Sequence, residues 1–222
     1  MGTITRTFAN NITTSGVFKP TAFNDASFDN VTSVPEGALP AGGNMVLLST
    51  QTASASSSIS FTTGIDSTYK EYMFIFNNIH PATNNVDFEF NFSIDSGSNY
   101  NVTKTTTTFT AYHDEADTNT NLYYDTSDDL AQSTSYQRLS VGGGVQNGND
   151  HSISGYLHLF EPSSDTFVKH FISNTCFVSN PDYQFNSYIA GYGNTTSAIN
   201  AIDFKYSSGN IDDGTIQMFG IL

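Results

Sequence analysis

The feature that most constrains the fold is the stretch of residues 86–95, where apolar and polar residues alternate without interruption. Val86, Phe88, Phe90, Phe92 and Ile94 fall on one side of an extended chain, and polar residues fall on the other. The period of two predicts a β-strand with one face on a core and one face in water. An isolated strand is unstable in water, so the rest of the chain must supply partner strands and a second sheet to cover the aromatic face.

Strand-like segments follow one another closely from residue 45 onward. They are rich in aromatic and β-branched residues and are separated by Gly, Asn, Asp, Ser and Pro turn signals. No long segment has a helical period. The chain is therefore predicted to be all-β, an antiparallel two-sheet sandwich of the jelly-roll type that spans residues 45–222. The other segments predicted as strands are residues 45–50, 56–63, 70–79, 103–112, 133–141, 151–160, 166–174, 183–192, 199–206 and 215–221.

Residues 1–44 differ from the rest and are predicted to form an N-terminal anchoring arm or stalk. Phe18, Phe23 and Phe28 recur every five residues, with small residues and Asn or Asp between them. Two structures fit this spacing: a short stack of β-turns in an intertwined stalk, and an extended arm whose phenylalanines fill pockets on a partner. Either structure depends on a partner, because so short a segment buries little apolar surface alone. Residues 35–43, rich in proline and glycine, are predicted to form a hinge.

The charge balance argues against several classes of partner. The chain has 21 acidic and 7 basic residues, for a formal net charge of −14. No basic cluster is present to neutralise phosphates, so we expect no nucleic-acid binding, and an anionic membrane surface would repel the chain. The N-terminal residues contain no apolar run long enough for a signal peptide or a membrane span. We therefore expect synthesis in a cytoplasm and no membrane insertion.

The single cysteine, Cys176, excludes an intramolecular disulfide and a cysteine-based zinc site. Free cysteines are among the most buried residues in proteins. We therefore expect Cys176 to be a small buried residue of the strand that contains Phe171 and Ile172.

The acidic stretch of residues 113–130 offers carboxylates that could serve in catalysis or bind a metal ion. Glu115 with Asp114, Asp117 or Asp129 would form the carboxylate pair of a glycosidase, and the same oxygens suit calcium. The spacing of a specific calcium loop is absent, however, and acidic loops on so acidic a chain are usually solvated. The histidines lack metal-ligand spacing, and neither a nucleophile elbow nor a phosphate-binding loop occurs. We predict no enzymatic activity, no cofactor and no metal.

Tyrosines near the same stretch suggest carbohydrate binding. Tyr112, Tyr123 and Tyr124 offer ring faces with a polar hydroxyl, and neighbouring Asn and Asp residues offer hydrogen bonds to sugar hydroxyls. Tyrosine is also ordinary filling of strands, so the structural interpretation stays open beside the functional one.

Three stretches carry a family resemblance: residues 64–81, residues 157–171 and residues 191–221, the last ending in Gly209-Asn-Ile-Asp-Asp-Gly-Thr-Ile-Gln-Met-Phe-Gly-Ile221. They resemble short virion surface proteins, of the fibre or decoration type, from tailed bacteriophages of marine bacteria, including cyanobacterial phages. The endings of such proteins often have Tyr where this chain has Phe219. The resemblance covers residues 44–222 and transfers no catalytic residues.

The resemblance implies a non-enzymatic structural protein on the virion surface, made in the host cytoplasm. The protein would be a short fibre or a capsid decoration protein, anchored to other virion proteins through residues 1–44. A homotrimer is expected, because three-fold symmetry lets a heterologous interface close. The alternative is the receptor-binding tip of a tail fibre, which recognises host surface glycan. Position on the head or on the tail stays open.

Overall fold

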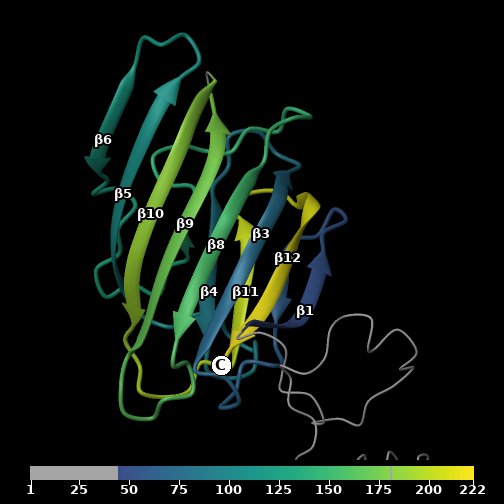
Figure 1. The fold of residues 1–222 in the computed structure, drawn as a ribbon, viewed down its shortest axis with the longest axis vertical. Helices are drawn as coiled ribbons and strands as arrows, with labels where there is room; N and C mark the ends of the chain where they lie inside the picture. The colour runs from purple at the N-terminus through teal and green to yellow at the C-terminus, as the bar shows by residue number, and fades with distance from the viewer. Residues whose placement is uncertain (1–44, 181) are drawn as a thin grey trace, which may run out of the picture. The chain divides into compact units, whose positions relative to one another are not determined.

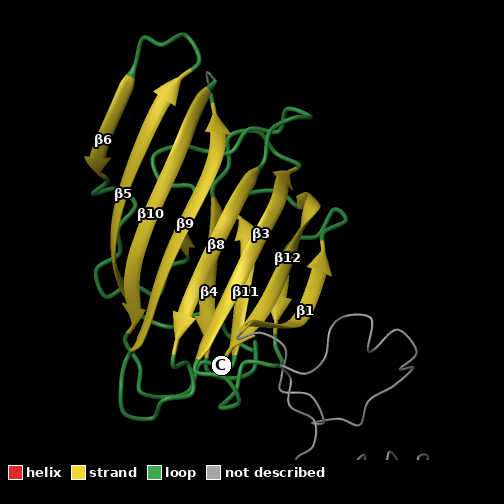
Figure 2. Ribbon diagram, in the orientation of Figure 1, coloured by secondary structure: helices red, strands yellow, loops and turns green. Residues whose placement is uncertain are grey.

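The computed structural model describes residues 45–180 and 182–222, which form twelve β-strands and no helix (Figures 1 and 2). The predicted anchoring residues Phe18, Phe23 and Phe28 lie outside the described residues. The strands are β1 (Met45–Thr52), β2 (Ile59–Phe61), β3 (Glu71–Pro81), β4 (Phe88–Ser93), β5 (Lys104–Asp114), β6 (Thr120–Tyr124), β7 (Gln137–Arg138), β8 (Ile153–Phe160), β9 (Lys169–Ser179), β10 (Tyr183–Gly193), β11 (Ala201–Tyr206) and β12 (Ile211–Ile221).

The strands form two antiparallel sheets that pack as a sandwich. The large sheet has eight strands in the order β1-β12-β3-β8-β9-β10-β5-β6, and the small sheet has four in the order β2-β11-β4-β7. Figure 1 shows β4 and β11 behind the large sheet. The predicted all-β sandwich is thus confirmed.

Eight of the strands have the connectivity of a jelly roll. The pairs β4–β7, β3–β8, β2–β11 and β1–β12 are nested like the two arms of one long hairpin, and each pair is hydrogen-bonded. Winding this hairpin around a core places β1-β12-β3-β8 in one sheet and β2-β11-β4-β7 in the other, which is the jelly-roll arrangement.

Two inserted hairpins enlarge one sheet of the jelly roll. β5 and β6 are inserted between β4 and β7, and β9 and β10 between β8 and β11. The insertions pair with each other through β10 and β5, and with the jelly roll through β9 and β8. They extend the large sheet well past the four strands of the small one, as the left half of Figure 1 shows.

The alternating stretch of residues 86–95 supplies the aromatic centre of the core. Phe88, Phe90 and Phe92 of β4 have no exposed surface and face the large sheet. Phe204 of β11 lies among them, with its ring centroid 5.1 Å from that of Phe76 and 6.1 Å from that of Phe88. Edge-to-face and stacked rings at such distances hold the two sheets together.

The expectation that the polar face of β4 lies in water is wrong. Asn91 and Ser93 are fully buried, because the chain after β4 folds back over this face. Asn91 Nδ2 donates to the carbonyl oxygens of Tyr100 and Thr134, and its Oδ1 accepts from Lys104 Nζ at 2.5 Å. The predicted burial of Ile94 is also wrong, since this side chain is 43% exposed beside the turn that ends the strand.

Three further details depart from the sequence prediction. The edge strand β6 was not predicted, because its residues are mostly exposed and show no alternation. Of the predicted strand at residues 133–141, only β7 forms. Cys176 is exposed rather than buried, because Thr175 and Phe177 on either side of it point inward.

Candidate functional site

The outer face of the large sheet carries a row of exposed aromatic side chains, which we call the aromatic row. It consists of one residue from each of five neighbouring strands, placed opposite one another by the strand register: Tyr156 (β8), Asn174 (β9), Tyr188 (β10), Phe109 (β5) and Tyr124 (β6). The four aromatic side chains are 37–48% exposed. The rings of Phe109 and Tyr188 stack in parallel, with centroids 4.7 Å apart and an interplanar angle of 7°.

Hydrogen bonds hold the polar groups of three side chains in this row, those of Asn174, Tyr188 and Tyr124. Asn174 Nδ2 donates to Asn186 Oδ1 at 2.5 Å, and Asn186 Nδ2 donates to the Tyr188 hydroxyl at 3.2 Å. At the edge of the sheet, the Tyr124 hydroxyl donates to Asp129 Oδ2 at 2.6 Å, and this bond raises the pKa of Tyr124. The rings of Tyr188 and Tyr124 are thus held in place before any ligand arrives, which lowers the entropic cost of binding.

A shallow groove of about 320 Å³ runs beside the aromatic row on the same face. Its floor is the next row of outward side chains, where Ala190 lies between Ile172 and Thr107. Its far wall contains the neighbouring rings of His170 and Tyr192, with centroids 6.0 Å apart. The volume is at the small end of the range for ligand sites.

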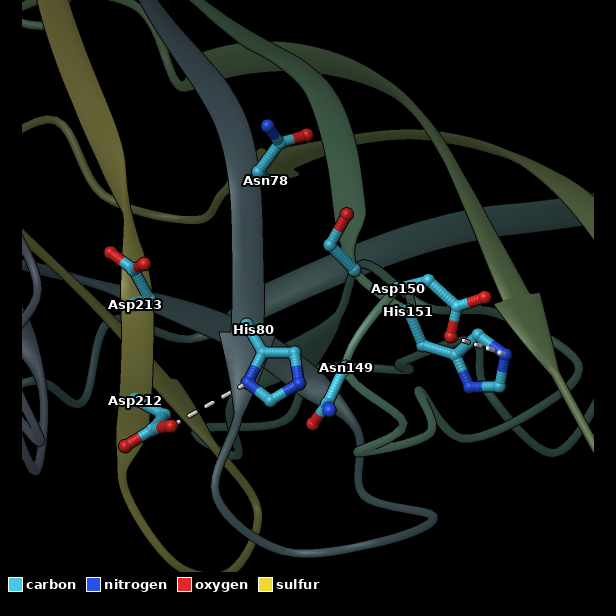
Figure 3. A pocket seen from close by; sticks show the side chains of 8 residues that line it. Asn78, His80, Asn149, Asp150, His151, Asp212 and Asp213 are labelled. Carbon is cyan, nitrogen blue, oxygen red and sulfur yellow. Dashed lines mark ion pairs between the residues drawn. The ribbon is translucent and has the colours of Figure 1, made fainter.

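A second hollow, of about 510 Å³, lies where β3 and β12 are irregular (Figure 3). His80 Nδ1 lies 3.8 Å from Asp212 Oδ2, and His80 Nε2 lies 3.1 Å from the carbonyl oxygen of Gly148. Left-handed backbone conformations at Asn78 and Gly214 accompany the shifts of register that bring these side chains together.

The acidic side chains of this hollow do not converge on one point. Asp150 is 91% exposed in its side chain and lies 3.8 Å from His151 Nε2, on the opposite side from Asp212 (Figure 3). No group of three or more His, Cys, Asp or Glu side chains that could hold a metal ion occurs in residues 45–180 and 182–222. The sequence prediction placed His80 just after one strand and Asp212 in the turn before the last strand. The register shifts that join the two residues leave no sequence signal except Gly214.

In the acidic stretch of residues 113–130, several carboxylates have structural partners. Asp114 accepts hydrogen bonds from the backbone N–H groups of Thr118 and Asn119, both at 2.8 Å, and these bonds with that of the Thr118 hydroxyl hold the pKa of Asp114 far below its usual range. Asp125 accepts from the backbone N–H of Ser127 at 3.0 Å. Asp114 and Asp125 thus stabilise turns, and Asp125 also lines a hollow of about 380 Å³ together with Asp87 and Asp128.

Arg138 on β7 joins this acidic stretch to the core strand β4. Its Nη1 lies 2.6 Å from Oδ1 of the buried Asp128, and its Nη2 lies 2.8 Å from Oδ2 of Asp87. Burial raises the pKa of Asp87, and the nearby Arg138 guanidinium opposes that shift. The guanidinium therefore stabilises two carboxylates that are largely removed from water.

We expect the substitution Arg138→Met to lower the free energy of unfolding by about 2 kcal/mol at pH 7, because it leaves both carboxylates without a cation. The loss should shrink as the pH falls towards 4, since Asp87, whose pKa is raised by burial, then takes up a proton in the native state of the variant. Denaturant unfolding at both pH values measures the effect. The control is Lys70→Met, which breaks the exposed pair between Lys70 and Glu161 and should change stability by less than about 0.5 kcal/mol. Equal losses in the two variants would contradict this interpretation.

The structure separates the three tyrosines that the sequence suggested for glycan contact. Tyr112 and Tyr123 lie on the inner face of the large sheet, with centroids 6.2 Å apart, and Tyr112 packs against Tyr183 and Phe185. Only Tyr124 lies on the outer face, where it ends the aromatic row. Phe109 and the groove were not predicted as a site, because the sequence does not indicate which strands are neighbours in the sheet.

Comparisons with protein-family models, with curated proteins and with solved structures give no match. In the described ranges, no helix is present that is long and apolar enough to cross a membrane. The outer face and its groove are therefore interpreted from their own geometry.

Proposed function

We propose that this chain is a non-enzymatic surface protein of a tailed-phage particle, either a short fibre or a capsid decoration protein. Residues 1–44 would anchor it to other virion proteins, and the jelly-roll sandwich would be displayed, with homotrimer formation at the virion surface. The proposal rests on the sequence resemblance and is consistent with the fold, since jelly rolls are common in viral capsid and lectin domains. Fold alone does not imply function, so the displayed face carries the rest of the argument.

The single observation that supports display is the aromatic row on the enlarged part of the large sheet. Four exposed aromatic side chains in one row, interrupted only by Asn174, are unusual on a surface that meets only water. Aromatic residues are enriched where surfaces bind other molecules, because their rings offer large contact area with few rotatable bonds. A displayed sandwich with this face outward is suited to bind a partner.

A second candidate function is recognition of host surface glycan at the tip of a tail fibre. The aromatic row and its amide neighbours favour this alternative, because ring faces and hydrogen-bonding groups lie close together. Immunogold labelling of intact particles with an antibody against residues 45–222 distinguishes the two functions. Label over the capsid supports decoration, label confined to the tail supports receptor binding, and no label on particles contradicts both.

We expect deletion of residues 1–44 to leave a folded sandwich that no longer joins particles. The deletion removes the proposed anchor and leaves the nested strand pairs of residues 45–222 complete. The measurement is the amount of protein in particles purified from cells that supply the full or the truncated chain, with circular dichroism of the truncated chain as the control for folding. Incorporation at the level of the full chain would refute the anchor.

A further inference from the structure

The groove beside the aromatic row has the chemistry of a saccharide site. Its floor is apolar at Ile172 and Ala190, and hydroxyl groups lie around these two residues, on Thr107 at the end of the floor row and on Thr105 and Tyr192 of the rim. A pyranose ring has the same division, with apolar C–H groups on its faces and hydroxyl groups around its edge. A ligand that is apolar throughout would form no hydrogen bonds with the rim hydroxyls, and a ligand that is polar throughout would gain nothing from the floor.

One rim of the groove is held in place by a hydrogen-bonded network. Gln132 Nε2 donates to Thr105 Oγ1 at 2.7 Å and to the Tyr192 hydroxyl at 3.4 Å. Asn194 Nδ2 donates to Gln132 Oε1 at 2.7 Å, so the amide that joins the two rim residues is itself fixed. A rim that is already ordered can bind a flexible, polar ligand at a smaller entropic cost.

The charge of this face selects against charged ligands. Neither the aromatic row nor the lining of the groove contains a Lys, Arg, Asp or Glu side chain, although the whole chain has a formal net charge of −14. Anionic saccharides would be repelled by the protein as a whole and would find no lysine or arginine in the groove. Cationic ligands would find no carboxylate there to pair with.

The direction of the groove fits an extended chain. Its lining residues come from β9, β10 and β5, so it crosses three neighbouring strands. Strands lie about 4.8 Å apart, which gives a span of about 10 Å from the first to the third. One strand spacing is close to the length of one sugar unit in an extended polysaccharide.

We propose that this groove binds an uncharged saccharide chain, which lies across β9, β10 and β5 with its ring faces on Ala190 and Ile172 and its hydroxyl groups on the rim. The inference rests on the proposed function, because it names the ligand class of the displayed face. The aromatic row lies next to the groove on the same face, one row of outward side chains beyond Ala190.

The test uses the full chain on an array of immobilised saccharides that includes uncharged glucans, mannans and galactans and, as acidic members, alginate and sulfated galactans. The best uncharged oligosaccharide is then titrated by calorimetry into three proteins: the wild type, Ala190→Tyr and Ala111→Tyr. Ala190 is exposed on the groove floor, whereas Ala111 lies on the same face across the aromatic row, opposite Leu122 and Asn186. Tyrosine is favourable in strands, so both variants should fold.

We expect wild-type binding to uncharged saccharides only, a loss of at least about tenfold in affinity for Ala190→Tyr, and a change within about twofold for Ala111→Tyr. The inference is overturned if the array shows no binding to uncharged saccharides, or binding to the acidic ones alone. It is also overturned if wild type and Ala190→Tyr bind with equal affinity. So would dissociation of an oligomer by Ala190→Tyr in sedimentation velocity, since the groove would then be an interface between copies. If the immunogold antibody labels particles but the saccharide array shows no binding, the saccharide site is refuted and the proposed virion role is not.

Discussion

Substitution of Phe204 by alanine should lower the free energy of unfolding by about 4 kcal/mol, the largest effect we expect from a single core substitution. The Phe204 side chain is fully buried on β11 of the small sheet, with rings of both sheets around it. Removing the ring takes its apolar surface from the core and leaves a cavity that rigid aromatic neighbours cannot fill. The neighbouring rings, with centroids 5.1–6.4 Å away, are those of Phe61, Phe74, Phe76, Phe88 and Phe90.

Equilibrium unfolding in guanidinium chloride, followed by tyrosine fluorescence and circular dichroism, measures this effect. The matched control is Phe167→Ala, because Phe167 is 71% exposed and its removal should change stability by less than about 0.5 kcal/mol. A loss below about 1 kcal/mol for Phe204→Ala, or similar losses for both variants, would contradict a core organised around Phe204.

Much of the jelly roll could be predicted from the sequence, because strand alternation reports directly on burial. The phenylalanines of residues 86–95 were assigned to the core from their period alone, and all three lie fully buried on β4. The inserted hairpins β5–β6 and β9–β10 were not distinguished from the jelly-roll strands. Their sequences have ordinary strand character, and which strand is inserted depends on pairing between residues far apart in the chain.

The polar residues of β4 show why alternation predicts one face better than the other. Phe90 must be buried wherever the strand lies, because exposing a phenylalanine is unfavourable. Asn91 is buried only where hydrogen-bonding partners reach it, and here Lys104 and two carbonyl groups do. Sequence alone does not indicate that such partners converge.

The candidate site was predicted less well than the fold for the same reason. Tyr112 and Tyr124 differ in sequence by only twelve positions, yet they lie on opposite faces of one sheet. The aromatic row brings together residues 109, 124, 156 and 188, and its existence depends on the register of four strand pairs. Its sequence signal is limited to single aromatic residues, three of them in segments predicted as strands and the fourth, Tyr124, in the unpredicted strand β6.

The buried Lys104 should make the protein more stable as the pH rises from 7 to 9. Its side chain has no exposed surface, and burial lowers the pKa of Lys104 to about 7 in the native state. The unfolded chain keeps the ordinary lysine pKa near 10.4, so between these values the unfolded state binds more protons than the native state. Stability then increases with pH, at up to about 1.4 kcal/mol per pH unit, and the gain from pH 7 to 9 is about 2 kcal/mol.

The variant Lys104→Met isolates this effect, since it removes the titrating group and keeps an apolar side chain of similar length. It loses the donor to Asn91 Oδ1, which shifts its stability by a similar amount at every pH. Burial also lowers the pKa of Lys169. Its contribution to the pH dependence is the same in both proteins and cancels in their stability difference. Measurements should stop at pH 9, because burial raises the pKa values of Tyr136 and Tyr206 and the tyrosines reverse the trend above pH 10.

The measurement is urea unfolding of wild type and Lys104→Met at pH 7, 8 and 9, together with the NMR titration of the Lys104 side chain. We expect the stability difference between the two proteins to change by about 2 kcal/mol over this range in favour of the wild type. A constant difference, or a titration midpoint near 10, would mean that Asn91 and the carbonyl oxygen of Val102 stabilise the ammonium group enough to offset its burial. The covered face of β4 would then hold a permanent charge, and its stability would depend on those two acceptors rather than on pH.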